Sequence, residues 1–291
     1  LGEPSLLVLD EPTTNLDVTT EAVILDLVRD LIRQRGTAVL YVSHNLGVVA
    51  GLCDRVAVLY AGELVEDAPA ADLYRRPLHP YTVGLLDSVP RLGLNRRQGA
   101  LQPIPGSVPK PDERPAGCVF APRCSAAIDL CQQRPKASQA AAGHTVRCHR
   151  WADISAGDVM LVARGRTFEV AENLEDREAS GETVLAVRDL TKRFDRPRGL
   201  ADLLAGRPAS QVRAVDGVSV QIGRGRTLGL VGESGSGKTT LARCVVGLAE
   251  RSGGDVTLLD LPLAPALNRR DPTALRRLQM EYVDLYQIHR F

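Results

Sequence analysis

Residues 227–240 read Thr-Leu-Gly-Leu-Val-Gly-Glu-Ser-Gly-Ser-Gly-Lys-Thr-Thr, and this stretch decides the fold. Its second part, Gly232–Thr239, fits the pattern G-x-x-x-x-G-K-[ST] of a phosphate-binding loop at every position. An apolar run typical of a buried strand precedes the loop, and a helical pattern from Lys238 to about Leu248 follows it. Because strand and helix both stand where such a loop needs them, the sequence predicts an α/β architecture around a phosphate site.

The glycines of this loop let backbone N–H groups curl around a phosphate at the positive end of the following helix. We expect Lys238 to reach the β- and γ-phosphates of ATP and Thr239 to bind Mg²⁺. The residues predicted to contact the nucleotide in this segment are Gly232, Ser234, Gly235, Ser236, Gly237, Lys238, Thr239 and Thr240. Phe194, on an earlier predicted strand, either stacks on the adenine or belongs to the core.

A second chemical signal lies at the start of the chain, where Leu-Leu-Val-Leu (6–9) is followed by Asp10, Glu11, Pro12 and Thr13. A carboxylate at the end of a buried strand can hold Mg²⁺, and its neighbour can orient or deprotonate an attacking water. Residues 37–44 form a second apolar run that ends at His44, and residues 55–66 predict a hairpin around Ala61-Gly62.

A helix is predicted over residues 18–35, with Asp17 as its N-cap and Gly36 as its end. The spacing of its apolar residues predicts one face that carries Val23, Leu27 and Leu31.

Together these motifs resemble those of ABC ATPases. The stretch LLVLDEPTTNLD (6–17) is similar to the Walker B and D-loop segment of that family, and YVSH (41–44) is similar to its switch-histidine strand. The resemblance implies a P-loop NTPase fold in which Asp10 is the Mg²⁺ carboxylate and Glu11 the catalytic carboxylate. It further implies that Asp17 is the D-loop aspartate at the nucleotide and that His44 contacts the γ-phosphate.

The middle of the chain indicates a subfamily. Leu-His-Pro-Tyr-Thr (78–82), Leu-Gln-Pro-Ile-Pro-Gly-Ser-Val-Pro (101–109) and four cysteines follow one another. They resemble the C-terminal extension of oligopeptide/dipeptide importer ATPases.

The four cysteines are Cys118, Cys124, Cys131 and Cys148. Thiols in a small, loop-rich segment of an intracellular protein argue against disulfides and for zinc or an iron–sulfur cluster. Their spacing is not the C-x₂-C of common zinc sites, and the family resemblance implies a [4Fe–4S] cluster. Zinc and the absence of any metal remain alternatives. Cys53 and Cys244 fall in a strand pattern and a helix pattern and are predicted to be buried hydrophobic residues.

The order of the motifs predicts a P-loop NTPase (ABC ATPase) core in two incomplete halves with a Cys-rich loop extension. The predicted parts are the C-terminal half of a first cassette (1–66), the extension (67–150), a linker (151–182) with a strand near 159–162, the N-terminal half of a second cassette (183–280) and an atypical tail (281–291). No LSGGQ-like signature occurs in the sequence, and we expect a tandem fusion truncated at both ends. The halves are predicted to dock into one sheet with the strand order 5–10, 38–43, 227–231, 56–60, the first three parallel.

The tail departs from the family pattern. Residues 275–280 fit the approach to a Q-loop, but residues 281–291 resemble a strand segment of aldo-keto reductases. We interpret this end as a chimeric join, because 11 residues cannot form a barrel of about 250 residues. The alternative is divergence, with Gln287 as a displaced Q-loop residue.

Composition restricts the remaining function classes. The chain of 291 residues is 44% hydrophobic and 24% charged with a net charge of +1, which argues against nucleic acid as a partner. No apolar run approaches the roughly 18 residues of a membrane span, and the first residues do not resemble a signal peptide. We therefore expect a peripheral protein at the cytoplasmic face of the cell membrane.

The resemblance implies an ATP-binding and ATP-hydrolysing subunit that powers oligopeptide or dipeptide import. Its implied cofactors are ATP, Mg²⁺ and the [4Fe–4S] cluster. Its implied partners are transmembrane permease subunits, a second ABC cassette and, indirectly, a peptide-binding protein. Because the resemblance places hydrolysis between two cassettes, we expect little turnover from this chain alone. The alternative function is that of a catalytically inactive fragment that binds nucleotide and metal. An oxidoreductase would rest on the tail alone.

Overall fold

The computed structural model describes residues 4–14, 16–89, 104–110, 113–159, 181–195 and 211–266. The predicted tail 281–291, the Q-loop approach 275–280 and most of the predicted strand at 159–162 lie outside these residues.

The first half of the chain alternates strands and helices and then becomes irregular. Its elements are β1 (Leu6–Asp10), α1 (Val18–Arg35), β2 (Ala38–Val42), α2 (Leu46–Leu52), β3 (Arg55–Tyr60), β4 (Glu63–Pro69), α3 (Ala70–Arg75), α4 (Pro80–Asp87), the 3₁₀ turns η1 (Ala121–Arg123) and η2 (Asp129–Gln132), β5 (Ser138–Ala141), β6 (His144–Val146) and α5 (Trp151–Ala156). The short helix α5 occupies the start of the segment predicted to be a linker.

The second half is mainly strands around one helix. Its elements are β7 (Thr183–Asp195), β8 (Gln211–Gly223), β9 (Thr227–Val231), α7 (Lys238–Val246), β10 (Gly253–Leu258) and β11 (Leu261–Pro262). Helix α7 ends at Val246, earlier than the predicted Leu248, because Gly247 adopts a left-handed conformation that closes it.

The two halves of the chain form one main sheet with the order β1-β2-β9-β3-β4-β6-β5. Strand β9 from the second half inserts between β2 and β3 from the first. The four neighbouring strands β1, β2, β9 and β3 all run parallel. This confirms the strand order predicted from the sequence and adds that β3 is also parallel to β9. Since carboxyl ends of parallel strands share an edge, Asp10, the phosphate loop and the residues after β2 and β3 must meet there.

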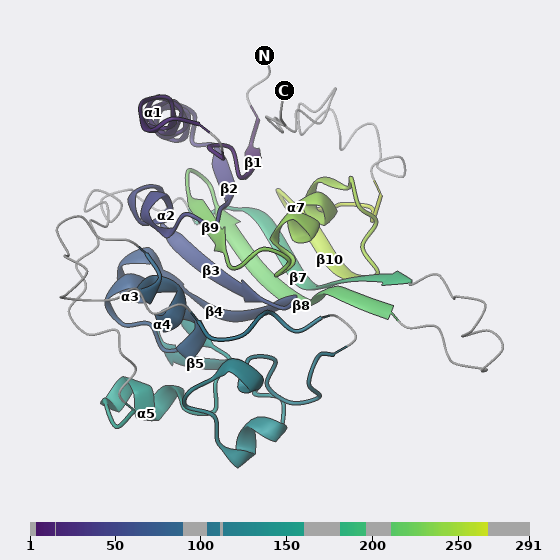
Figure 1. Cartoon of the computed structure of the whole chain (residues 1–291). Coiled ribbons are helices and arrows are strands. Elements are labelled where there is room, and N and C mark those ends of the chain that lie inside the picture. The colour runs from purple at the N-terminus through teal and green to yellow at the C-terminus, as the bar shows by residue number, and fades with distance from the viewer. Residues whose placement is uncertain are drawn as a thin grey trace.

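Alternate residues of these strands fill two cores, one on each face of the sheet. Val8, Leu40, Leu59 and Leu230 pack on the side of α7 and of the second sheet, which has the order β11-β10-β7-β8. The neighbouring residues on each strand pack against α1 to α4 on the opposite face. Figure 1 shows α7 and α1 on opposite sides of the main sheet. Both faces of the parallel strands are buried, which explains their continuous apolar sequences.

The predicted hairpin of residues 55–66 is confirmed as β3 and β4, joined at Ala61 and Gly62, which both have positive φ. Buried Glu66 on β4 then anchors the extension that follows. Its carboxylate accepts hydrogen bonds from the backbone N–H groups of Leu78 (2.7 Å) and His79 (3.0 Å), and Nε2 of His144 lies 2.8 Å from it. The extension is therefore attached to the main sheet and continues it through β6 and β5.

Helix α1 begins after Asp17 and ends at Gly36, as predicted, but its buried face is not the predicted one. Val28 and Ile32 are buried, whereas Val23, Leu27 and Leu31 are 57%, 59% and 45% exposed. The helix carries apolar residues on more than one face, and only one face meets the sheet. Within the described ranges no helix is long and apolar enough to cross a membrane.

Candidate nucleotide site

The loop between β9 and α7 has a backbone that only glycine accepts at two positions. Gly232 and Gly237 have φ of +148° and +105°. An added Cβ would collide with the carbonyl oxygen of Leu59 at Gly232 and with that of Ala214 at Gly237. The loop thus rests against the ends of β3 and β8, and its N–H groups lead into the first turn of α7, where anions bind.

Lys238 is buried and folds back over this loop. Its Nζ donates to the carbonyl oxygens of Gly232 (2.8 Å) and Glu233 (3.0 Å). Burial lowers the pKa of Lys238, while the carboxylates of Glu11, Asp10 and Glu233 act in the opposite direction. The ammonium group is therefore held at the loop among carboxylates, where a phosphate would give it a further partner.

Asp10 and Thr239 come together although 229 residues separate them. The Oγ1 of Thr239 donates to Oδ1 of Asp10 over 3.0 Å. Burial raises the pKa of Asp10, and the hydrogen bond from Thr239 and the nearby Lys238 and Arg243 oppose that rise. A desolvated carboxylate beside a hydroxyl supplies the hard oxygen ligands that Mg²⁺ prefers.

Glu11 and His44 lie at the ends of neighbouring strands. Nδ1 of His44 lies 3.2 Å from Oε1 of Glu11, and Thr14 donates from its hydroxyl to Oε2 over 3.3 Å. Glu11 has a φ of +50°, a left-handed conformation that costs a non-glycine residue energy and is typical of functional sites. The conformation presents the carboxylate at the pocket, which Glu11 helps to line.

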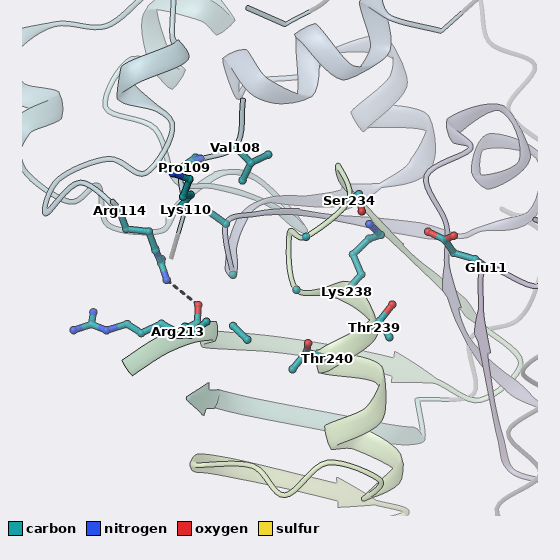
Figure 2. Close-up of a pocket in the computed structure, with 16 residues that line it drawn as sticks. Glu11, Val108, Pro109, Lys110, Arg114, Arg213, Ser234, Lys238, Thr239 and Thr240 are labelled. Atoms are coloured by element: carbon teal, nitrogen blue, oxygen red, sulfur yellow. Dashed lines mark hydrogen bonds between the residues drawn. The ribbon is translucent and has the colours of Figure 1, made fainter. Parts of the chain in front are cut away.

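A cavity of about 430 Å³ lies over the loop. The predicted residues that line it are Glu11, Ser234, Gly235, Gly237, Lys238, Thr239 and Thr240. The structure adds Ala61, Gly62, Val108, Pro109, Lys110, Arg114, Val212, Arg213 and Ala214. Figure 2 shows Val108, Lys110 and Arg114 across the loop from Glu11. In the sequence, Val108 and Pro109 served only to identify the extension. The cationic residues Lys110, Arg114 and Arg213 belong to no motif that would have indicated their position at the cavity.

Gly232 and Ser236 support the cavity without lining it. Ser236 is buried, and its carbonyl oxygen accepts from the backbone N–H of Gly62 (2.8 Å), which joins the loop to the hairpin turn. Asp10 and His44 reach the site through Thr239 and Glu11 respectively.

Phe194 and Asp17 lie outside the residues that line the cavity. Phe194 is 45% exposed, which contradicts the core alternative; its cross-strand partner Val212 does line the cavity, and adenine stacking remains a prediction. Asp17 caps α1 by accepting from the backbone N–H groups of Thr19 (3.1 Å) and Thr20 (3.0 Å). The hydroxyl and backbone of Thr20 lower the pKa of Asp17. Its predicted contact with nucleotide stays a prediction.

The four cysteines of the extension lie close enough for their charges to interact. Burial raises the pKa of Cys124 to about 11 and that of Cys148 to about 12. Cys118 and Cys131 add to both shifts, and Cys124 adds to that of Cys148. The backbone N–H of Cys118 donates to the carbonyl oxygen of Cys131 over 2.9 Å. Among the described residues, no three His, Cys, Asp or Glu side chains are placed to hold a metal ion. Cys53 and Cys244 are buried, as predicted, although Cys53 follows α2 instead of lying in a strand.

Two protein families match parts of this chain. Residues 65–131 match the family described as "Oligopeptide/dipeptide transporter, C-terminal region", and residues 215–287 match the family "ABC transporter". The first match begins within β4 and covers most of the Cys-rich extension, and the second covers the phosphate loop.

Curated relatives agree with these matches. The chain is 41% identical over 286 residues to the oligopeptide transport ATP-binding protein OppD of Mycobacterium bovis, which covers 97% of this chain and 45% of that protein. It is 49% identical over 158 residues to a putative peptide import ATP-binding protein of Brucella ovis, and the match covers 53% of this chain and 47% of that protein. It is also 49% identical over 146 residues to the oligopeptide transport ATP-binding protein AppD of Bacillus subtilis, and the match covers 50% of this chain and 44% of that protein. The chain thus spans about half the length of these relatives.

Proposed function

We propose, from the premise that this chain belongs to the ABC transporter family of ATP-binding proteins, that it binds MgATP over the loop Gly232–Thr239 and hydrolyses it to drive peptide import. The family matches and the names of the relatives support this assignment. The single observation that carries the site is the 3.0 Å contact between Thr239 and Asp10, which joins the phosphate loop to the carboxylates of β1.

Each residue has a distinct part in the proposed reaction. The loop N–H groups and Lys238 would bind the phosphates, and Thr239 and Asp10 would hold Mg²⁺, which would supply charge neutralisation for phosphoryl transfer. Glu11 would orient the attacking water or take its proton, and His44 would fix the Glu11 carboxylate and contact the γ-phosphate. The cavity of about 430 Å³ lies within the usual range for small-ligand sites.

The proposed partners follow from the same assignment. Transmembrane permease subunits would use the ATP hydrolysis to move the peptide, and a second cassette would complete the hydrolytic site. A peptide-binding protein would deliver the substrate. The exposed residues Val23, Leu27 and Leu31 are available for a protein contact. The proposed location is the cytoplasmic face of the cell membrane, and the near-neutral net charge gives no support for nucleic acid as a partner.

We also propose a [4Fe–4S] cluster held by Cys118, Cys124, Cys131 and Cys148. Cys118, Cys124 and Cys131 each raise the pKa of Cys148, and this nearness supports a shared ligand set. Within the described residues the thiols are not arranged to hold a metal ion, so their arrangement favours neither zinc nor a cluster. A cluster would connect loops that have little core of their own, a structural contribution typical of small metal-bound segments.

Titration calorimetry with MgATP tests the nucleotide site. Wild-type chain should bind, and Lys238→Ala should bind at least roughly tenfold more weakly, because a charge-assisted contact to phosphate is lost. Lys136→Ala, on the exposed surface of the extension, is the matched control and should bind like wild type. Equal affinity of wild type and Lys238→Ala would contradict the proposed site.

A further inference from the structure

The phosphate loop contains a carboxylate, and an arginine from the Cys-rich extension neutralises it. Glu233 is the second residue of the loop, and its two oxygens accept from Nη1 (2.7 Å) and Nη2 (3.2 Å) of Arg123. This two-pronged contact joins η1 of the extension to a loop 110 residues further along the chain. The side chain of Arg123 is almost fully buried and that of Glu233 is 30% exposed, so the pair is partly shielded from water and salt.

Arg123 is itself held in place by the extension. Its Nε donates to the carbonyl oxygen of Pro105 (2.8 Å), and Nη2 lies 3.3 Å from the carbonyl oxygens of both Ile104 and Gly106. Nη1 also donates to the hydroxyl of Tyr60 on β3 (3.3 Å). The guanidinium group therefore has one orientation before any nucleotide arrives.

A tyrosine of the extension fixes the backbone at the same position. The N–H of Glu233 donates to the hydroxyl of Tyr81 over 2.8 Å. Tyr81 packs edge-on against Tyr60, with 4.6 Å between ring centroids, and both contact Phe120. The aromatic cluster and Arg123 thus hold the backbone and the side chain of one loop residue.

The charge of Glu233 bears on the ligand that the loop is proposed to take. Its carbonyl oxygen accepts from Nζ of Lys238, and its carboxylate acts on the pKa of that lysine. An unpaired carboxylate at this position would repel the phosphates and compete for Lys238.

We propose that Arg123 is a positioning residue for nucleotide binding, through which the Cys-rich extension sets the affinity of the phosphate loop by neutralising Glu233. The proposal rests on the proposed function of this loop as an ATP site. It implies that whatever disturbs the segment around Arg123, including its neighbour Cys124, also weakens nucleotide binding.

Three variants of the full chain, titrated with MgATP by calorimetry, test this. Arg123→Gln should bind roughly tenfold or more weakly, because Glu233 is left unpaired. Glu233→Gln should bind as well as wild type or better, and the double variant Arg123→Gln/Glu233→Gln should return to within about threefold of wild type. Arg150→Gln, whose ion pair with Asp153 is local to α5, is the matched control.

Rescue in the double variant separates charge neutralisation from a structural effect, because removing Glu233 does not restore the bonds of Arg123 to the backbone of residues 104–106. Thermal unfolding of each variant accompanies the titrations. Loss of binding in Glu233→Gln, or a double variant as weak as Arg123→Gln, overturns this inference alone. A wild-type chain that binds no MgATP overturns the proposed function and this inference with it.

Discussion

Nδ1 of His44 lies 3.2 Å from Oε1 of Glu11, at the ends of two parallel strands that pair directly. Glu11 can accept the proton of an attacking water, and His44 can fix the orientation of the Glu11 carboxylate. It lies on the side of the phosphate loop opposite Lys110 and Arg114, as the position of Glu11 in Figure 2 shows.

Replacing Glu11 with Gln should separate binding from hydrolysis. We expect MgATP affinity within about threefold of wild type and phosphate release reduced by roughly 10²-fold or more, because the general base is lost while the phosphate contacts remain. Glu21→Gln on α1 is the matched control. Equal release rates in wild type and Glu11→Gln would contradict the assignment of Glu11. Release at background level from wild type on its own, restored when a second cassette is added, would agree with a site completed between two cassettes, and background release in both cases would favour the alternative of a nucleotide-binding chain without turnover.

Replacing Gly237 with Ala should damage the loop itself. The residue has a φ of +105°, and a Cβ would collide with the carbonyl oxygen of Ala214. We expect a loss of about 1–3 kcal/mol in the free energy of unfolding measured in urea, together with weaker MgATP binding. Gly181→Ala, which meets nothing within 4 Å, should unfold like wild type. Unchanged stability and affinity in Gly237→Ala would show that the loop differs from the structure.

The proposed cluster gives a prediction about the iron content of the chain. Chain purified without oxygen should be brown and contain iron, and Cys124→Ser should lose most of it, because a hydroxyl is a poor ligand for iron in place of a thiolate. Cys53→Ala, in the core beside α2, should keep its iron. Stoichiometric zinc without iron, or iron content unaffected by Cys124→Ser, would contradict the cluster.

The sequence was sufficient to predict the centre of the sheet but not its surroundings. The loop Gly232–Thr239 and the carboxylates Asp10 and Glu11 belong to motifs whose chemistry requires parallel strands with a shared edge, so their assembly could be predicted. The buried face of α1 could not, because apolar residues on several faces leave the choice to tertiary packing. The sequence also did not predict the position of Arg114 at the cavity or the contacts of Arg123 with Glu233. Single arginines in an irregular segment have no periodicity that indicates what they touch.

The central claim is that residues from both halves of the chain bind one MgATP, and a double-mutant cycle on Asp10 and Thr239 tests it most directly. MgATP affinity is measured for wild type, Asp10→Asn, Thr239→Val and the double variant, with ATP in excess EDTA as the metal-free control. If the two side chains hold the same Mg²⁺, both single variants weaken MgATP binding and the coupling energy is about 1 kcal/mol or more, and it disappears in EDTA. Single-variant effects on binding free energy that add to within about 0.5 kcal/mol would contradict a shared metal site, and so would a coupling energy that persists unchanged in EDTA.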